Sequence, residues 1–321
     1  ANSSGDVLFP DGDKAIFGAG SDLQIYHDGS HSYVDENGTG QLKIRSNGTG
    51  VLLQTVSGEN LATFANNSAV NLYYDNAAKL ATTATGIDVT GISVSDGMST
   101  NTSGTSNFIA GVNAGNSIAS GGNYNTVVGD EAGTAITTGD NNVAVGYGAG
   151  KAVTTAVQNV LIGYNAGDAL NTGSINVAIG NNALSADTKG ARSVAIGYET
   201  LQNQNFTSDT SVYNTAVGGQ AGKQITTGVN NTLIGGLAGD ALTDADYNTA
   251  VGFEALSTDV LGSRSVAIGF NALHLQNFTT ATNTYNVGVG FNAGQQITTG
   301  VNNTLIGGLA GDAITTGGSN T

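Results

Sequence analysis

The chain has 321 residues, with 49 glycines, one proline and no cysteine or tryptophan, so disulfide and thiol chemistry are excluded. Its 24 acidic and 9 basic residues give a formal net charge of −15, and the basic residues are scattered, which argues against nucleic acid and anionic membrane surfaces as partners. No apolar run reaches the roughly 18 residues of a membrane-spanning helix, so we expect no membrane insertion.

Both ends of the sequence point to a longer polypeptide. The first residue is Ala1, the only methionine is Met98, and the last two residues, Asn320 and Thr321, match the start of a further repeat. We therefore expect the chain to continue beyond both ends, with the repeat region truncated at its C-terminus.

Residues 1–92 are predicted to form a β-rich fibre module of short strands. Apolar and polar residues alternate in short segments that glycine-rich turns separate, which is typical of strands. Residues 93–106, rich in serine, threonine and glycine, form the predicted connector to the rest of the chain. The predicted strands are Lys14–Phe17, Asp22–Tyr26, Ser32–Val34, Gln41–Arg45, Val51–Gln54, Ala69–Tyr74, Lys79–Thr83 and a segment within Gly86–Gly91.

Two strings in this module resemble segments of marine bacteriophage tail fibres. They are D-L-Q-I-Y-H-D-G at Asp22–Gly29 and the longer string at Asn71–Gly91, which ends in G-I-D-V-T-G. Bacterial surface proteins carry the same modules, so the resemblance implies a fibre and leaves phage and bacterial origins open.

Residues 107–321 contain a short motif that repeats twelve times. The motif is Asn, any residue, a small residue or Leu, then Val or Ile, then Gly, and its copies are 17 residues apart with two intervals of 21 and a first interval of 18. A longer period of 72 lies on top, since Ala221–Thr243 matches Ala293–Thr315 at 21 of 23 positions. The motif glycines are Gly111, Gly129, Gly146, Gly163, Gly180, Gly197, Gly218, Gly235, Gly252, Gly269, Gly290 and Gly307.

Seventeen residues suit one coil of a parallel β-solenoid, or β-roll, and are too few for a helical repeat or a propeller blade. We predict two short strands and two turns in each coil. At about 4.8 Å per coil, twelve stacked coils would form a rod segment of roughly 50–60 Å.

Each coil is numbered here from its motif glycine, which is position 0. Position −1 is Val or Ile in eleven of twelve copies, position −2 is always apolar or glycine, and position +3 is Ala in eleven. Consecutive strand residues point to opposite faces, so two neighbouring apolar positions predict that both faces of the strand are buried. A single thin solenoid leaves one of these faces in water. We therefore expect further copies of the chain to cover it, in a parallel homotrimer.

Position −4 is Asn in ten copies and Ser in two. Asn side chains bond nearby backbone groups, and stacked copies can form an amide ladder. We therefore predict a structural role for this column.

Several copies resemble the head repeats of YadA-like trimeric adhesins, among them N-T-A-V-G at Asn214–Gly218, S-V-A-I-G at Ser193–Gly197 and N-T-L-I-G at Asn231–Gly235. The resemblance covers roughly residues 107–321 and implies a homotrimeric, left-handed parallel β-roll. The 17-residue repeat is longer than is usual in that family, so details of the coil are expected to differ.

Chemistry-bearing groups are few. His27 and His31 flank a D-G-S turn, D-G-D at Asp11–Asp13 lacks the later carboxylate of a calcium loop, and no nucleophile, phosphate-binding or zinc motif occurs. We expect no catalytic residues, cofactor or metal site, and regard adventitious Ca²⁺ at the G-D-A tips as the weaker alternative to charges placed for solubility. These tips carry Asp168, Asp240 and Asp312; the third histidine is His274.

The two long coils, Tyr198–Tyr213 and Phe270–Tyr285, are expected to place their four extra residues in outward bulges. Two interpretations stay open for their aromatic residues: they contact a receptor or a neighbouring fibre, or the phenylalanines fold back over their own coil. The candidate contact residues are Phe206, Tyr213, Phe278 and Tyr285.

The favoured interpretation is a homotrimeric fibre shaft of a phage tail fibre, a rigid spacer for host attachment that is located in the virion. The alternative is a bacterial extracellular adhesin or surface filament of the same fold. An ice-binding solenoid ranks lower, because the paired threonines of the T-T-G tips point to opposite faces and several coils lack them. The expected partners are further copies of the chain, with a host receptor and other virion proteins as additional candidates.

Overall fold

The computed structural model describes residues 6–84, 86–90 and 102–321, which contain strands and turns and no helix. The chain divides into two compact units, residues 1–96 and 97–321. The division falls within the predicted connector, of which residues 93–101 lie outside the described residues.

The first unit holds two antiparallel sheets. Strands β1 to β3 pair in chain order, and so do β4 to β8, so that each strand is a hairpin neighbour of the next one. The three-stranded sheet consists of β1 (Lys14–Phe17), β2 (Leu23–His27) and β3 (Ser32–Glu36). The five-stranded sheet consists of β4 (Gly50–Gln54), β5 (Asn60–Ala65), β6 (Val70–Tyr74), β7 (Ala77–Thr82) and β8 (Ile87–Val89).

Two details of this unit differ from the sequence-based prediction. Gln41–Arg45 alternates like a strand but is not one, and its Ile44 is 70% exposed, because no neighbouring segment pairs with it. Strand β5 was not predicted, since its inward residue Ala62 gives only a weak apolar signal.

The five-stranded sheet has an apolar face that no described residue of its own unit covers. Residues directly opposite each other in an antiparallel pair share a face, and one row across all five strands reads Leu53, Ala62, Leu72, Leu80 and Val89. Ala62 is the only buried hydrophobic residue among residues 6–84 and 86–90, while Leu53, Leu72 and Val89 are 50%, 46% and 42% exposed. The described part of this unit therefore has almost no hydrophobic core of its own.

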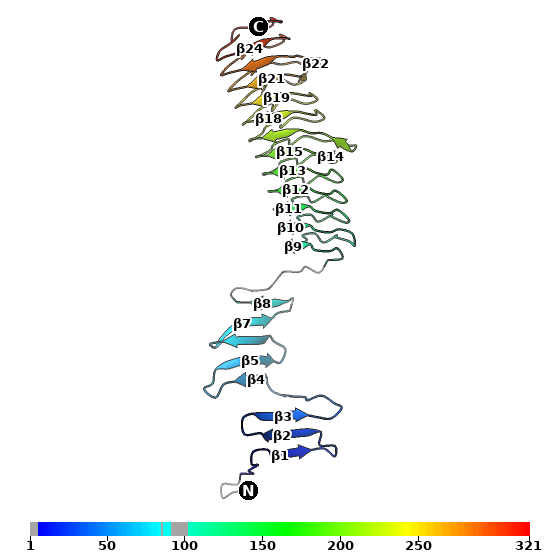
Figure 1. The fold of residues 1–321 in the computed structure, drawn as a ribbon, viewed down its shortest axis with the longest axis vertical. Helices are drawn as coiled ribbons and strands as arrows, with labels where there is room; N and C mark the ends of the chain where they lie inside the picture. The colour runs from blue at the N-terminus through cyan, green and yellow to red at the C-terminus, as the bar shows by residue number, and fades with distance from the viewer. Residues whose placement is uncertain (1–5, 85, 91–101) are drawn as a thin grey trace. The chain divides into compact units, whose positions relative to one another are not determined.

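The second unit is a parallel β-solenoid with the predicted 17-residue coils, which stack one on the next (Figure 1). Each coil contributes one three-residue strand to a twelve-stranded parallel sheet, in which equivalent residues of neighbouring coils pair directly. The strands are β9 (Phe108–Ala110), β10 (Thr126–Val128), β11 (Val143–Val145), β12 (Val160–Ile162), β13 (Val177–Ile179), β15 (Val194–Ile196), β17 (Thr215–Val217), β18 (Thr232–Ile234), β19 (Thr249–Val251), β21 (Val266–Ile268), β23 (Val287–Val289) and β24 (Thr304–Ile306).

The prediction of two strands per coil was wrong for the ordinary coils. Their second wall consists of turns with residues at positive φ, yet its backbone still bonds to the next coil, as in Gly133 N–H to Ala149 O at 2.9 Å and Thr137 N–H to Thr154 O at 2.9 Å. Only the neighbourhoods of the long coils add short second strands. These pair as β14 (Gly190–Ala191) with β16 (Thr210–Ser211), and β20 (Gly262–Ser263) with β22 (Thr282–Asn283).

The motif glycine is required by both conformation and contact. Gly163 has φ of +135°, which disfavours any side chain, and a Cβ there would lie 2.4 Å from the carbonyl oxygen of Gly180 in the next coil. The other motif glycines share this conformation, so position 0 is a corner of the coil that only glycine suits.

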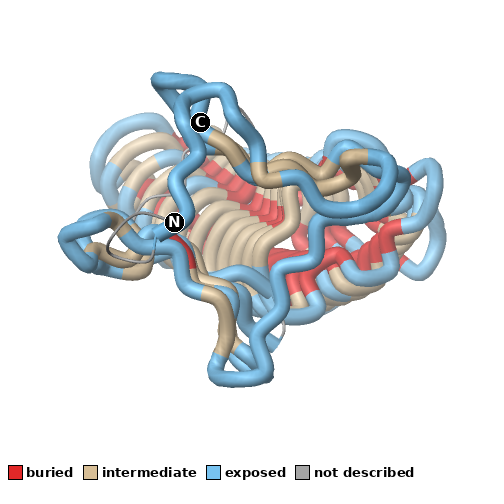
Figure 2. The backbone as a smooth tube through the Cα atoms, turned by 90° about the horizontal axis from the view of Figure 1, so that it is seen from below, coloured by how far each residue is buried: buried red, intermediate tan, exposed pale blue. Residues whose placement is uncertain are grey.

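The core consists of small and branched residues that stack in columns along the solenoid (Figure 2). Position −2 points inward in every coil and is represented by Val127, Leu161 and Leu233, all fully buried. Position +3 supplies a buried alanine in most coils, as at Ala132 and Ala238. These small residues keep the two walls of the coil close together.

The predicted asparagine ladder is confirmed. Asn159 Oδ1 accepts the backbone N–H of Asn176 in the next coil at 2.9 Å, and Asn159 Nδ2 donates to Gly173 O in its own coil at 3.0 Å. The same two bonds recur in neighbouring coils, with the ladder asparagines almost fully buried. Each asparagine therefore ties the strand to the facing wall and also to the next coil.

We predict that Asn159→Ala destabilises the solenoid by about 2–4 kcal/mol, because it leaves the buried Asn176 N–H and Gly173 C=O without partners. Thermal denaturation followed by circular dichroism measures the effect. Asn181→Ala is the matched control, since Asn181 is exposed. Equal melting temperatures for the two variants would contradict a structural role for the ladder.

Candidate interaction surface

The outward face of the twelve-stranded sheet is apolar and uncovered in the single chain. In each three-residue strand from β10 onward the middle residue is buried, and the two flanking residues, at positions −3 and −1, point outward and are half-buried or exposed. Position −3 is Val or Thr in all coils but the first, which has Phe108, and position −1 is Val or Ile except at Ala110. No charged residue stands in either column.

The sequence-based expectation that both faces of the strand are buried therefore holds only for the inward face of one chain. Ile234 and Ile268 are each 39% exposed at position −1, whereas their neighbours Leu233 and Ala267 are fully buried. Large contiguous apolar faces on soluble proteins mark interaction sites. We therefore take these two columns as the candidate interaction surface and refer to them as the outward columns.

Stacked aromatic rings follow the strands at position +1. Tyr147 and Tyr164 have ring centroids 5.3 Å apart, and Phe270 stacks on Phe253 at 5.8 Å and on Phe291 at 5.3 Å. All five rings are about half exposed. Aromatic residues in such positions are typical of protein interfaces.

Tyrosine and arginine precede the strands at position −5. Tyr213 and Tyr285 are both 54% exposed, and Arg264 lies over the ring of Tyr247 with 4.7 Å from guanidinium carbon to ring centroid. Arg192 lies 5.7 Å from the ring of Tyr213 in the same way. Of the four predicted contact residues, the two tyrosines thus stand exposed beside the outward columns.

The two phenylalanines among the predicted contact residues are buried. Phe206 and Phe278 are only 7% exposed, and the backbone N–H of Phe206 donates to Asp187 Oδ1 at 3.1 Å. The interpretation in which these rings fold back over their own coil fits this burial, and the interpretation in which they are exposed contact residues does not. The sequence does carry a signal for this burial. It is a pair of buried polar residues in the core next to each loop, Asp187 with Gln204 and Asp259 with Gln276.

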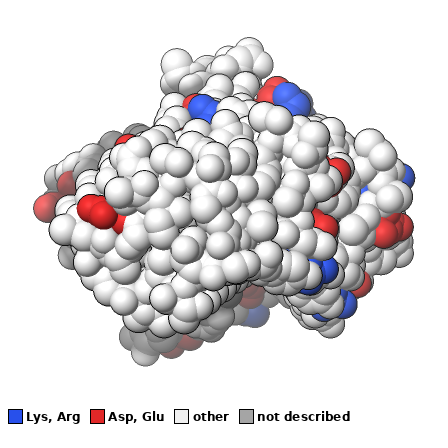
Figure 3. Space-filling model, turned by 90° about the horizontal axis from the view of Figure 1, so that it is seen from above, with Lys and Arg blue, Asp and Glu red and all other residues white. Residues whose placement is uncertain are grey.

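Charged side chains gather away from the outward columns, on the turn around positions +2 and +5. Lys223 Nζ lies 2.6 Å from Glu199 Oε2, and hydrogen bonds from Lys223, Gln220 and Tyr198 lower the pKa of Glu199 to about 2. Lys151 pairs with Glu131 at 2.5 Å in the same columns. Basic side chains on the face shown in Figure 3 form no single patch.

The sequence predicts no metal or catalytic site at the three histidines or at the aspartates of the G-D-A tips. Each of these residues has its own surroundings. His27 Nδ1 lies 3.1 Å from Ser32 Oγ, His31 lies 4.0 Å from Asp28, and His274 Nδ1 lies 2.7 Å from Ser257 Oγ. Asp168 and Asp240 each have one buried oxygen without a hydrogen-bond partner. Within residues 6–84, 86–90 and 102–321, no group of three or more His, Asp or Glu side chains is arranged to hold a metal ion.

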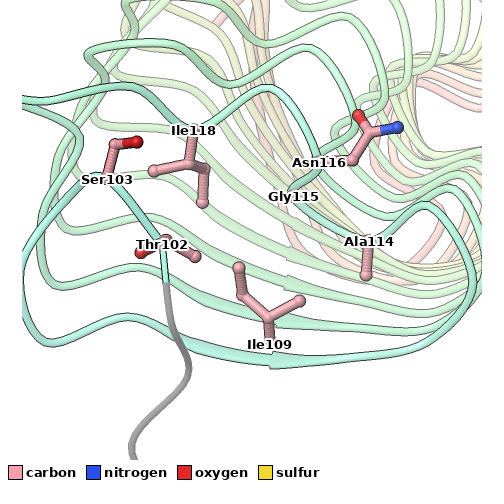
Figure 4. Close-up of a pocket in the computed structure, with 7 residues that line it drawn as sticks. All are labelled: Thr102, Ser103, Ile109, Ala114, Gly115, Asn116 and Ile118. Carbon is pink, nitrogen blue, oxygen red and sulfur yellow. The ribbon is translucent and has the colours of Figure 1, made fainter. Parts of the chain in front are cut away.

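A hollow of about 460 Å³ opens at the N-terminal end of the solenoid, where the first coil leaves the core uncovered (Figure 4). Its lining has no ionisable side chain to activate a hydroxyl group or hold a charged ligand. The lining residues are Thr102, Ser103, Ile109, Ala114, Gly115, Asn116 and Ile118.

Comparison with known proteins found no matching family model, no matching curated protein and no matching solved structure. Since the described residues contain no helix, they contain none that could cross a membrane.

We predict that Asp240→Asn stabilises the solenoid at neutral pH. Burial, opposed only in part by hydrogen bonding, raises the pKa of Asp240 from 3.8 to about 6. The folded protein therefore binds this proton more tightly than the unfolded chain, so ionisation costs stability; the cost is full above pH 6 and vanishes below about pH 4.

The carboxyl group is half-exposed, so the expected gain at pH 7.5 is only about 1 kcal/mol, with no gain at pH 4. Denaturant unfolding at the two pH values measures it. Asp130→Asn, at an exposed carboxylate, serves as the control. An Asp240→Asn effect of the same size at both pH values would contradict the assignment.

Proposed function

We propose that the chain is the shaft of a homotrimeric fibre, most consistent with a phage tail fibre, in which it acts as a rigid spacer for host attachment. The observation that carries this proposal is the pair of uncharged outward columns that run the length of the solenoid.

Association through these columns has a clear driving force. Burying a fully exposed Val or Ile side chain contributes roughly 1.5–3 kcal/mol. Position −1 supplies eleven such residues per chain, and each of them, partly buried already, gains a fraction of that value on association. The columns are as long as the solenoid and repeat at every coil, so parallel copies at equal height match along their whole length. The resemblance to trimeric adhesin repeats is the reason for proposing three copies.

The first unit supports the same conclusion independently. Single-layer sheets with an uncovered apolar face are not stable in water on their own. The three-stranded sheet repeats the situation of the five-stranded one, since Ala15, Ile25 and Val34 lie in one row and the last two are 44% and 54% exposed. Further copies of the chain supply a second layer to both sheets at once.

The spacer role follows from the repetition of the coils. Every coil bonds to the next on both walls, and the asparagine ladder adds a bond at most steps, which resists bending and stretching. The strings at Asp22–Gly29 and Asn71–Gly91 add the resemblance to phage tail fibres. A host receptor and other virion proteins are then the partners of the regions at the ends of such a shaft.

A bacterial surface adhesin or filament has the same architecture and the same mechanical role. The genomic neighbourhood separates the two: virion genes beside this one support the tail fibre, and secretion or cell-wall genes support the adhesin.

We predict a solution mass three times the 32.0 kDa of one chain, and loss of assembly in Ile234→Asp. The substitution places a charge in the position −1 column of every chain, and an unpaired charge in a dry interface is very costly. Light scattering coupled to size exclusion measures both masses.

Thr226→Asp introduces the same charge at an exposed position of the neighbouring coil and should retain the wild-type mass. A folded wild-type monomer, or an Ile234→Asp variant with the wild-type mass, would refute the proposed interface.

A further inference from the structure

Two buried polar clusters interrupt the otherwise apolar core, one beneath each long coil. Position +7 is Ile, Leu or Val in eight coils, but it is Asp187 and then Gln204 in one pair of neighbouring coils. The same pair recurs 72 residues later as Asp259 and Gln276, and all four side chains are fully buried.

A second substitution accompanies the first one in the same coils. Position +4 is Gly wherever position +7 is aliphatic, and it is Leu wherever position +7 is Asp or Gln, at Leu184, Leu201, Leu256 and Leu273. These leucines are fully buried although their φ values are +49° to +54°, a conformation that costs a leucine roughly 1–2 kcal/mol.

The two positions compete for the same space. A Cβ at Gly167 would lie 2.9 Å from a terminal methyl of Leu170 and 2.8 Å from one of Leu161, so an ordinary coil has no room for a side chain at position +4. In the coils with Asp or Gln, the leucine enters the core from position +4 instead. The exchange fills the core and frees position +7 to carry a polar group.

The freed polar groups form a hydrogen-bonded cluster in which three donors are directed toward the carboxylate. Asp187 Oδ1 accepts the backbone N–H of Gly190 at 2.9 Å and of Phe206 at 3.1 Å, and Asp187 Oδ2 accepts Gln204 Nε2 at 2.7 Å. Gln204 Oε1 in turn accepts Asn214 Nδ2 at 2.9 Å.

The cluster also replaces a missing step of the asparagine ladder. Position −4 is Ser193 here, and its hydroxyl lies 3.0 Å from Gln204 Nε2. In ordinary coils the Asn at this position donates to a carbonyl at position +10, which in the long coil belongs to the loop. The side chain of Gln204 therefore bridges the ladder from Ser193 to Asn214 across the longer coil.

The backbone N–H and the backbone carbonyl oxygen of Phe206 both form hydrogen bonds with the coil below. Its N–H reaches Asp187, and its carbonyl oxygen accepts Lys189 N–H at 3.0 Å and Thr188 Oγ at 2.8 Å. The second copy repeats this pattern, with Phe278 N–H to Asp259 Oδ1 at 2.9 Å and Leu261 N–H to Phe278 O at 2.8 Å.

We propose that each buried Asp–Gln pair anchors the loop of the long coil at one height of the solenoid, with the carboxylate accepting the backbone N–H of the loop. We refer to each pair as the loop anchor. Asp187 and Gln204 are thus positioning residues for residues 205–211, and Asp259 and Gln276 are the same for residues 277–283. The role is independent of how many chains assemble.

Exchanging the two polar groups tests the loop anchor in the full-length protein. Asp187→Asn sets an amide donor against Gln204 Nε2, and Gln204→Glu sets two carboxylates against each other. The double variant Asp187→Asn with Gln204→Glu restores a complementary pair, because the new carboxylate accepts from the new amide, from Asn214 Nδ2 and from the Ser193 hydroxyl.

Hydrogen exchange at the amide of Phe206 is the readout, with the amides of the twelve-stranded sheet as the internal reference. We expect exchange at Phe206 to accelerate about tenfold or more in Asp187→Asn and to return toward the wild-type rate in the double variant. Asp209→Asn, on the exposed part of the same loop, should change neither rate.

If Asp187→Asn proves unable to fold, recovery of a folded protein in the double variant supports the proposed loop anchor. Wild-type protection of Phe206 in Asp187→Asn would overturn it, and so would a double variant as impaired as the two single variants together. The pair Asp259→Asn with Gln276→Glu repeats the test at the second cluster.

Discussion

Most backbone hydrogen bonds of a solenoid coil are made with the coils above and below it. An ordinary coil has three strand residues and several turns, and within the coil its backbone makes only a few turn bonds, such as Val153 N–H to Gly150 O at 3.0 Å. Equivalent atoms must therefore stack at every step. This demand explains the 17-residue period, the left-handed glycine at position 0 and the asparagine ladder, since each is a device that works only when the same residue stands in the next coil.

The same demand decides what a longer coil needs. Extra residues displace the carbonyl that the ladder asparagine uses, and they carry loop backbone that requires new partners. The long coils and the coils directly before them carry a linked set of residue changes: Ser at position −4, Asp and Gln at position +7, and Leu at position +4. None of these is favourable alone. A buried carboxylate without a cation is costly, and burial raises the pKa of Asp259 although the N–H groups of Phe278, Gln276 and Gly262 oppose that shift.

Strict stacking also shapes the surface. A thin coil has room for one inward residue per strand, so two of every three strand residues point outward. In this chain those two are β-branched and uncharged at nearly every coil, and aromatic residues stand before and after them in several coils. A repeat with uncharged, β-branched residues outside as well as apolar residues inside has the surface that the proposed association requires.

The period and the column pattern sufficed to predict the solenoid and its asparagine ladder, because both depend on local identity between coils. The number of strands per coil could not be predicted, since the second wall makes strand-like bonds through residues at positive φ that resemble loops in sequence. The burial of Phe206 was one of two interpretations left open, although a sequence signal that favours it existed. Asp187 and Gln204 interrupt an aliphatic column, and the compensating leucines at position +4 identify the interruption as part of the core.

Thiol labelling of the native protein tests most directly whether the outward columns are an interface. The chain has no cysteine, so single thiols at positions 233, 234 and 227 report separately on the inward face, the outward columns and an exposed turn. The account predicts that Ile234→Cys reacts with a maleimide as slowly as Leu233→Cys, while Thr227→Cys reacts fast. Labelling of Ile234→Cys at the rate of Thr227→Cys would show that the outward columns face water, and would contradict the account.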